Sequence, residues 1–145
     1  MGSPRVLGWV AVAMGAALIL LPFLSWYSAS LPGGTVRVSG VGASGELWIV
    51  PPMGLAVVLG GVLVARRGPA LPTAITIAVA GALAAVWSLR NLARTPVRAV
   101  VEQAGGAAVV DAQVTIEPAA PLAVLAGTLA ALAGGLLVLR VWLAP

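Results

Sequence analysis

Residues 121–143 read PLAVLAGTLAALAGGLLVLRVWL and decide the fold, because the stretch is long and apolar and Arg140 is its one charged residue. An apolar run of about 18 or more residues with few charges is typical of a transmembrane helix, since about 20 helical residues cross a hydrocarbon core of about 30 Å. We therefore predict a transmembrane helix over 121–143. Pro121 fits its first turn, where a missing N–H group costs nothing.

Working outward from this stretch, three further apolar runs have similar length. They cover Val6–Leu24, Val50–Ala65 and Leu71–Leu89, with a short turn over 66–70. The first would span about 28 Å as a helix at about 1.5 Å per residue. Arg5 and the small residues 28–30 would also suit a cleaved signal peptide, but the apolar run exceeds the usual length of about 7–15 residues. We interpret it as a retained span.

Five tryptophans lie near the ends of these runs and none lies in the middle of one. An indole ring is amphipathic and settles at the headgroup level of a bilayer, so tryptophan marks membrane interfaces. We expect all five to act as membrane-interface anchors. They are Trp9, Trp26, Trp48, Trp87 and Trp142.

Composition supports a membrane protein and argues against an enzyme. The chain is 61% hydrophobic and 8% charged, whereas soluble domains carry about 25% charged residues. It contains no cysteine and no histidine, so it lacks a thiolate nucleophile and the commonest general base and metal ligand. No phosphate-binding loop, paired catalytic carboxylates or mid-span ionisable residues are present. We expect no catalytic residue, no metal and no cofactor.

The net charge of +4 comes from arginines spread along the chain, which favours contact with anionic lipid over nucleic acid. The absence of lysine and the abundance of alanine and glycine are typical of a bacterium with a GC-rich genome. We place the protein in the bacterial cytoplasmic membrane, with several spans. The basic hairpin Arg66-Arg67 and the basic first flank favour cytoplasmic termini, although the arginines divide equally between the two sides.

The two loops on the other side, 25–49 and 90–120, carry strand patterns. Apolar and polar residues alternate in Thr35–Ser39, and Glu46–Val50 is interpreted as its hairpin partner after a glycine-rich turn. Ala108–Glu117 has the clearest alternation and should add a third strand. The segment 91–103 predicts a short interfacial helix whose basic residues contact lipid headgroups. Those residues are Arg94 and Arg98.

The sequence therefore predicts an all-α membrane protein, a four-transmembrane-helix bundle with a small extracytoplasmic β-sheet cap. Two surfaces are candidates for contact with a partner. One is a small-residue face on the fourth span, which permits close approach of another helix; its residues are Ala123, Gly127, Ala131 and Gly135. The other is the outer strand, with Val110, Ala112, Val114 and Ile116. The small-residue face serves either packing within the bundle or docking to another protein.

Two sequence patterns resemble known families. The first comprises residues 21–27, LPFLSWY, residues 35–40, TVRVSG, and Pro51-Pro52 before a span ending in Arg66-Arg67. Over roughly the first half, the chain resembles an actinobacterial family of tryptophan-associated four-span membrane proteins. That resemblance implies four spans and no established activity.

The second pattern is Trp26 followed by Gly45-Glu46-Leu47-Trp48, which resembles the outer-loop signature of claudins. Here a glutamate interrupts the triplet and the paired cysteines of that family are missing. The resemblance implies a claudin-like architecture, with Trp26 and Trp48 packed together beneath the sheet. Two independent interface anchors are the alternative.

Together these features favour a non-enzymatic accessory or structural subunit that packs against a larger integral membrane protein complex and contacts membrane lipids. The alternative is a small lipid- or quinone-binding protein that acts alone or as a homo-oligomer. That alternative needs only an apolar crevice between helices.

Overall fold

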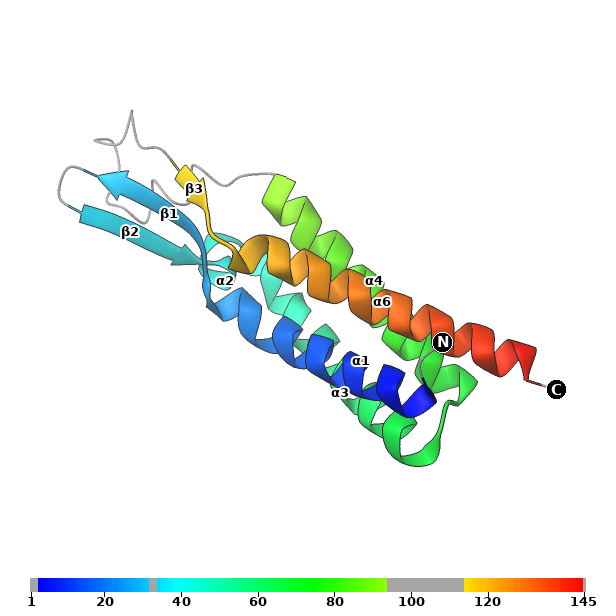
Figure 1. Ribbon diagram of the computed structural model, residues 1–145. Coiled ribbons are helices and arrows are strands. Elements are labelled where there is room, and N and C mark those ends of the chain that lie inside the picture. Colours follow the sequence, from blue (N-terminus) through cyan, green and yellow to red (C-terminus); the bar gives the residue numbers. More distant parts are fainter. Residues whose placement is uncertain (1–2, 32–33, 94–113, 145) are drawn as a thin grey trace.

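A computed structural model describes residues 3–31, 34–93 and 114–144. Four long helices lie side by side (Figure 1). Each is long and apolar enough to cross a membrane, as the sequence predicts. A small sheet lies at one end of the bundle, the sheet end, and the α3–α4 turn lies at the other, the turn end (Figure 1). The helices are α1 (Pro4–Leu20), α3 (Val50–Arg67), α4 (Leu71–Ala93) and α6 (Ala119–Leu143).

Helix α1 ends earlier than Leu24, where the sequence analysis placed its end. After Leu20 the chain tightens into a short 3-10 helix, η1 (Leu21–Phe23). Pro22 explains this change, because it has no N–H group to continue the α-helical hydrogen bonds. The backbone becomes extended at Leu24 and enters the sheet.

The sheet has three antiparallel strands in the order β2-β1-β3. Strand β1 (Ser25–Leu31) is central and pairs with β2 (Gly34–Ser39) on one side, with Ser28 opposite Arg37. On its other side β1 pairs with β3 (Val114–Ile116). The three-stranded sheet was predicted, and so were β2 and β3. Residues 108–113 of the predicted third strand lie outside the described residues.

The predicted second strand, Glu46–Val50, is wrong. A one-turn helix α2 (Gly40–Ala43) follows β2, and a 3-10 helix η2 (Gly45–Ile49) leads directly into α3. Leu47 and Val50 are buried, whereas the residues between them are exposed. A burial period of three fits a helical turn, because a strand would bury every second residue. The partner of β2 is β1, for which no strand was predicted.

The helices pack as two close antiparallel pairs, α1 with α3 and α4 with α6. Glycines allow each pair to approach at backbone level. A methyl group on Gly8 would lie 2.8 Å from the carbonyl oxygen of Gly61, and one on Gly127 would lie 2.7 Å from the amide nitrogen of Ala85. One apolar core lies near the sheet around Trp26 and another lies deeper in the bundle.

Candidate functional site

The predicted small-residue face of α6 is divided between the inside and the outside of the bundle. Ala123 is fully buried, and Gly127 faces α4 across the close contact with Ala85. Ala131 is half-buried, and its amide nitrogen lies near Gly81. Gly135 is exposed and has open space where a side chain would be. A step of four residues advances about 40° around an α-helix, so a four-residue repeat turns away from any one face.

The internal contact of α6 follows a different spacing. Its buried residues recur at alternating steps of three and four, which keeps them on one side of the helix. Most of them are alanine or glycine, and Gly134 contacts the backbone of Ala78 in α4. This row contains Ala120, Ala123, Gly127, Ala130, Gly134 and Leu137.

A row made only of leucines follows the outward side of α6. Its members also recur at alternating steps of three and four residues, and each is 37–74% exposed. We call it the leucine row. It contains Leu122, Leu125, Leu129, Leu132, Leu136, Leu139 and Leu143. The average spacing of 3.5 residues is the repeat by which one helix packs along another in a coiled coil.

The other long helices present different outward patterns. In α3 the exposed leucines Leu55, Leu59 and Leu63 recur every four residues, and α4 mixes valine, isoleucine and leucine. The leucine row is therefore particular to α6. The leucine row was not predicted from the sequence, where attention fell on the small residues of this span, although the spacing of the leucines can be seen there.

Two small residues, Gly135 and Thr128, lie beside the leucine row. Gly135 is open, as described above, and Thr128 is exposed with its hydroxyl donating to the carbonyl oxygen of Val124 at 2.8 Å. Because Thr128 satisfies its hydroxyl within its own helix, it presents a methyl group and no unpaired donor. The outward side of α6 therefore combines leucine knobs with room at Gly135 for a side chain from a neighbouring helix.

The five tryptophans take different positions. Trp9, Trp48 and Trp142 are 60%, 56% and 78% exposed, and Trp87 is half-buried. Trp26, by contrast, is fully buried, so its ring has no access to lipid headgroups. Its indole N–H donates to the carbonyl oxygen of Leu21 at 2.8 Å.

Trp26 and Trp48 serve separate contacts. The Trp26 ring covers Gly40, where a methyl group would lie 2.7 Å from the indole. Trp48 meets Phe23 edge to face, with ring centroids 5.4 Å apart. The glycine at position 40 is therefore what allows the buried indole to fit beneath the start of α2.

Of the predicted outer-strand surface, the structure describes two residues. Val114 is half-buried and packs against the core beneath the sheet, while Ile116 is 45% exposed. Val110 and Ala112 lie outside the described residues, as do the predicted headgroup contacts Arg94 and Arg98. The described part of β3 thus contributes mainly to the attachment of the sheet.

Tyr27 and Asn91 form a polar contact at the sheet end that sequence analysis missed. The hydroxyl of Tyr27 in β1 donates to the carbonyl oxygen of Asn91 at 3.2 Å. The side-chain amide of Asn91 donates in turn to the carbonyl oxygen of Trp87 at 2.9 Å. Burial raises the pKa of the Tyr27 phenol above its usual value. The bond from Tyr27 to Asn91 attaches the central strand to the end of α4, and the bond from Asn91 to Trp87 lies within that helix.

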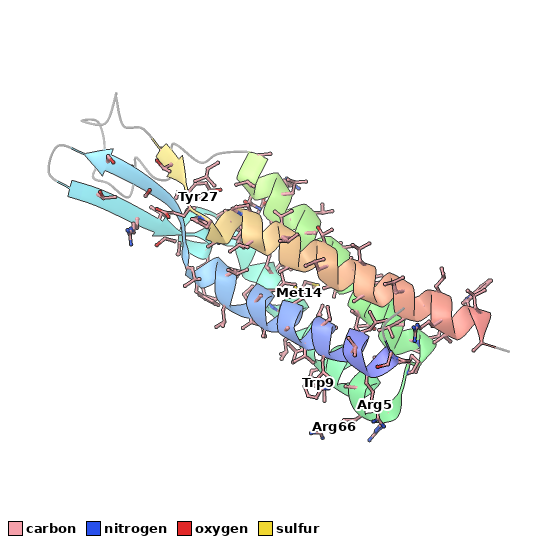
Figure 2. The ribbon with its side chains drawn as sticks, viewed as in Figure 1. Arg5, Trp9, Met14, Tyr27 and Arg66 are labelled. Carbon is pink, nitrogen blue, oxygen red and sulfur yellow. The ribbon has the colours of Figure 1, made fainter. Side chains whose placement is uncertain are left out.

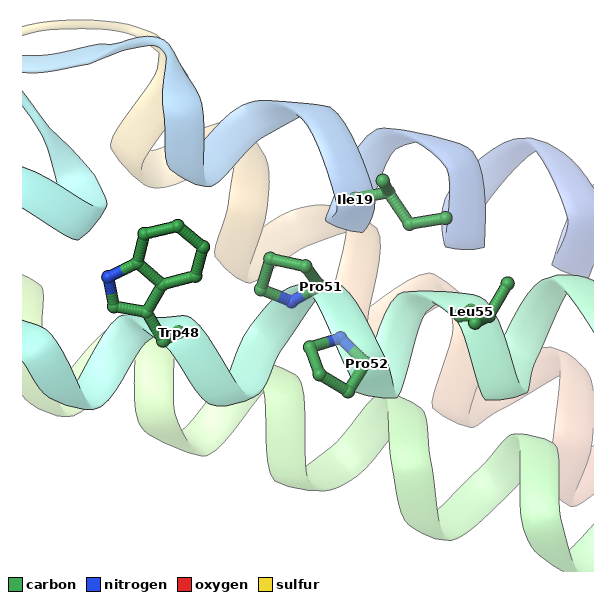
Figure 3. Close-up of a pocket in the computed structure, with 5 residues that line it drawn as sticks. All are labelled: Ile19, Trp48, Pro51, Pro52 and Leu55. Carbon is green, nitrogen blue, oxygen red and sulfur yellow. The ribbon is translucent and has the colours of Figure 1, made fainter.

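An apolar groove opens between α1 and the start of α3. It has a volume of about 390 Å³ and is lined by Ile19, Trp48, Pro51, Pro52 and Leu55. Figure 3 shows the Trp48 ring and the proline rings along one wall, with Ile19 opposite them on α1. We call it the proline groove. Its lining offers shape and apolar contact with almost no polar surface.

The described residues contain no group of three or more His, Cys, Asp or Glu side chains placed to hold a metal. Ser88 is fully buried, and its hydroxyl is the one buried side-chain polar atom in the described ranges without a hydrogen-bond partner. No histidine exists to activate it. Comparison with protein families, with curated proteins and with solved structures found no match for this chain.

Proposed function

We propose that this protein is a non-enzymatic integral membrane subunit that docks onto a larger membrane protein complex through the leucine row of α6. The observation that carries the proposal is the all-leucine repeat at alternating steps of three and four on the outward side of one helix. The occupant is a transmembrane helix of the partner complex, packed lengthwise against α6.

Membrane insertion is supported by the surface of the whole bundle. Large apolar side chains are exposed along the outward side of every long helix, including Val10, Leu59, Val79 and Leu132. A soluble monomer rarely exposes a contiguous apolar patch larger than a few hundred Å². Lipid contact on these surfaces removes that cost, so a bilayer suits the molecule.

Charge at the turn end supports one orientation in the membrane. Arg5, Arg66 and Arg67 gather there, and the positive-inside rule places short basic segments in the cytoplasm. We propose a bacterial cytoplasmic membrane with the turn end inside and the sheet end outside. Ala70 is exposed in the turn between α3 and α4, and labelling of Ala70→Cys by a membrane-impermeant thiol reagent in sealed cells would contradict this orientation.

Leucine contact with lipid alone does not require the observed spacing. Lipid tails are as apolar as leucine, so helices in a membrane associate through close packing of their surfaces. A repeat of 3.5 residues keeps knobs on one line along a partner helix, whereas repeats of four residues, as on α3, spiral away from it. Gly135 adds a hollow at which the two helices can approach.

A single introduced cysteine tests the docking surface cleanly, because the natural chain has none. Leu132→Cys, labelled with a thiol-reactive photo-crosslinker in native membranes, should give one cross-linked product of defined mass and fixed stoichiometry. Leu59→Cys on the outward side of α3 is the matched control and should give none. Equal products from both positions, or a product containing only this chain, would contradict docking to a larger complex.

A second variant separates docking from folding. Gly135→Leu fills the open space beside the leucine row and should release the subunit from its partner while the bundle remains folded. Ala82→Leu places the same leucine side chain on the exposed side of α4 and should leave the complex intact. Co-purification in mild detergent measures both. Retention of the partner by Gly135→Leu at the level of Ala82→Leu would count against this surface.

The proline groove supports a second candidate function, binding of a lipid or quinone tail by this chain alone or as a homo-oligomer. A narrow apolar groove holds a flexible hydrocarbon chain by shape and contact. Leu55→Trp should fill the groove and remove a lipid that survives purification, whereas Val79→Trp, on the exposed side of α4, should retain it. Mass spectrometry of the purified protein measures the bound lipid, and identical lipid content in the two variants would exclude the groove.

A further inference from the structure

Three arginine side chains surround one hollow at the turn end of the bundle. The hollow has a volume of about 380 Å³ and lies between the start of α1 and the turn that joins α3 to α4. We call it the arginine hollow. Figure 2 shows Arg5 and Arg66 at this end of the molecule. Its lining is Ser3, Pro4, Arg5, Arg66, Arg67, Gly68 and Pro69.

The fold brings these charges together from distant parts of the sequence. The close backbone contact of Gly8 with Gly61 and Ala65 holds the start of α1 against the end of α3. Gly68 then turns the chain at φ 89° and ψ 171°, a region of backbone conformation that is essentially restricted to glycine. As a result Arg66 and Arg67 stay at the tip, beside Arg5.

The charges in the arginine hollow are not balanced by the acids that the structure describes. Glu46 lies in η2 and Glu117 directly follows β3, so both are at the opposite, sheet end. Three exposed guanidinium groups thus share one hollow with no described carboxylate near them, and an anion bound there would offset their mutual repulsion. Ser3 carries no charge, and its hydroxyl accepts a hydrogen bond from the Val6 N–H at 3.4 Å as the cap of α1.

We propose that the arginine hollow binds the phosphodiester headgroup of an anionic phospholipid. Guanidinium groups bind phosphate oxygens through paired N–H donors, and the two unesterified oxygens of a phosphodiester can accept hydrogen bonds from more than one arginine. Free inorganic phosphate shares this chemistry. The lipid as its source rests on the proposed membrane location.

The surroundings of the hollow favour a lipid over a free anion. Trp9 is 60% exposed about one turn along α1 from Arg5, at the level expected for an indole beneath headgroups (Figure 2). Val6 and Leu63 are exposed nearby along α1 and α3, and they provide apolar surface for acyl chains. A headgroup in the hollow and chains along these helices would satisfy both kinds of surface at once.

Native mass spectrometry of the full chain in neutral detergent tests the proposal. The probes are phosphatidylglycerol, phosphatidylcholine and inorganic phosphate. Wild-type protein should retain phosphatidylglycerol in preference to phosphatidylcholine, and the double substitution Arg66→Gln with Arg67→Gln should weaken that retention by roughly 30-fold, from about two arginine–headgroup contacts. The double substitution Arg37→Gln with Arg90→Gln removes the same charge at the sheet end and should retain the preference.

The outcomes separate the two sources of phosphate and separate this site from the docking function. Binding of inorganic phosphate that depends on Arg66 and Arg67, without a preference between the two lipids, would overturn the proposal of a lipid ligand. It would identify a free anion as the ligand instead. Equal lipid preference in the two double variants would overturn the site altogether. The isolated chain is used, so loss of docking through α6 leaves the result unchanged. A circular dichroism spectrum of each variant confirms that the helices are intact.

Discussion

Tyr27 connects the sheet to the helices through one side chain. Its ring is buried beneath β1, and its hydroxyl donates to the carbonyl oxygen of Asn91 at the end of α4. A neutral intramolecular hydrogen bond contributes about 1 kcal/mol of stability. Tyr27→Phe should therefore lower the free energy of unfolding by about 1 kcal/mol at neutral pH, as measured by denaturant titration in detergent.

The same residue should make the stability of the protein decline at alkaline pH. Burial raises the pKa of the folded-state phenol above the value of 10.0 that applies to an exposed tyrosine. The folded state therefore holds its proton at pH values where the unfolded state has lost it. The contribution of Tyr27 to stability is fully present below the pKa of the unfolded state. It is lost as the pH rises above about 10 and through the raised pKa of the folded state.

Tyr27→Phe removes the titrating group, so its stability should stay flat across the alkaline range where the wild type declines. Tyr27 is the only tyrosine in the chain, and the ultraviolet difference absorbance of tyrosinate therefore reports its ionisation directly. An alkaline decline of equal size in the wild type and in Tyr27→Phe would assign the effect to other groups.

At the scale of single elements, α6 differs on its two sides, and two adjacent glycines separate them. Gly134 faces α4, where a methyl group would collide with the backbone of Ala78, while Gly135 has open space around it. Gly134→Ala should destabilise the bundle by about 1–3 kcal/mol through overpacking. Gly135→Ala should stabilise it by up to about 1 kcal/mol, because alanine favours a helix more than glycine.

Unfolding of the two alanine variants in mixed detergent micelles, followed by circular dichroism, measures this difference. The pair is closely matched, since the positions are neighbours in the same helix and receive the same methyl group. Equal stability of the two variants would mean that the contact between α4 and α6 is looser than the structure shows.

The long helices were predictable because twenty or so apolar residues leave one economical arrangement in a bilayer. The boundaries of the helices and strands were less predictable. Pro22 ends α1 early, and Gly45–Ile49 continues a helical path into α3 where an apolar segment after a glycine-rich turn suggested the second strand of a hairpin. Burial there is imposed by contacts with distant elements, which a local pattern does not contain. Strand β1 was missed although apolar residues alternate with serines from Tyr27 to Leu31, because the adjacent apolar residues Trp26 and Tyr27 break that pattern at its start.

The candidate surfaces were predictable only in part. The fourth span was correctly singled out as rich in small residues, yet the structure places Gly127 inside the bundle and leaves Gly135 outside. Only the packing of α4 against α6 decides which side of the helix is free. The arginine hollow likewise depends on a contact between the start of α1 and the end of α3, more than fifty residues apart in sequence.

At the scale of the whole molecule, two antiparallel helix pairs pack against each other around a shared core, and the sheet connects them again at one end. Gly8 and Gly61 bring α1 close to α3, and Gly127 and Gly134 bring α6 close to α4. Strand β1 comes from the first pair and β3 directly precedes α6 of the second. The sheet therefore spans the division between the halves, with Tyr27 and Asn91 as a second connection.

The central place of β1 has a consequence for biosynthesis. Strands β1 and β2 leave the ribosome together, whereas β3 follows only after the long helices α3 and α4 have been made. At about 5–20 residues per second the interval lasts several seconds. During it, the edge of β1 that later receives β3 has its backbone donors and acceptors open to another strand. A nascent chain of this topology thus depends on the timely arrival of its own last strand, and a pause in translation before residue 114 would prolong its exposure to mispairing.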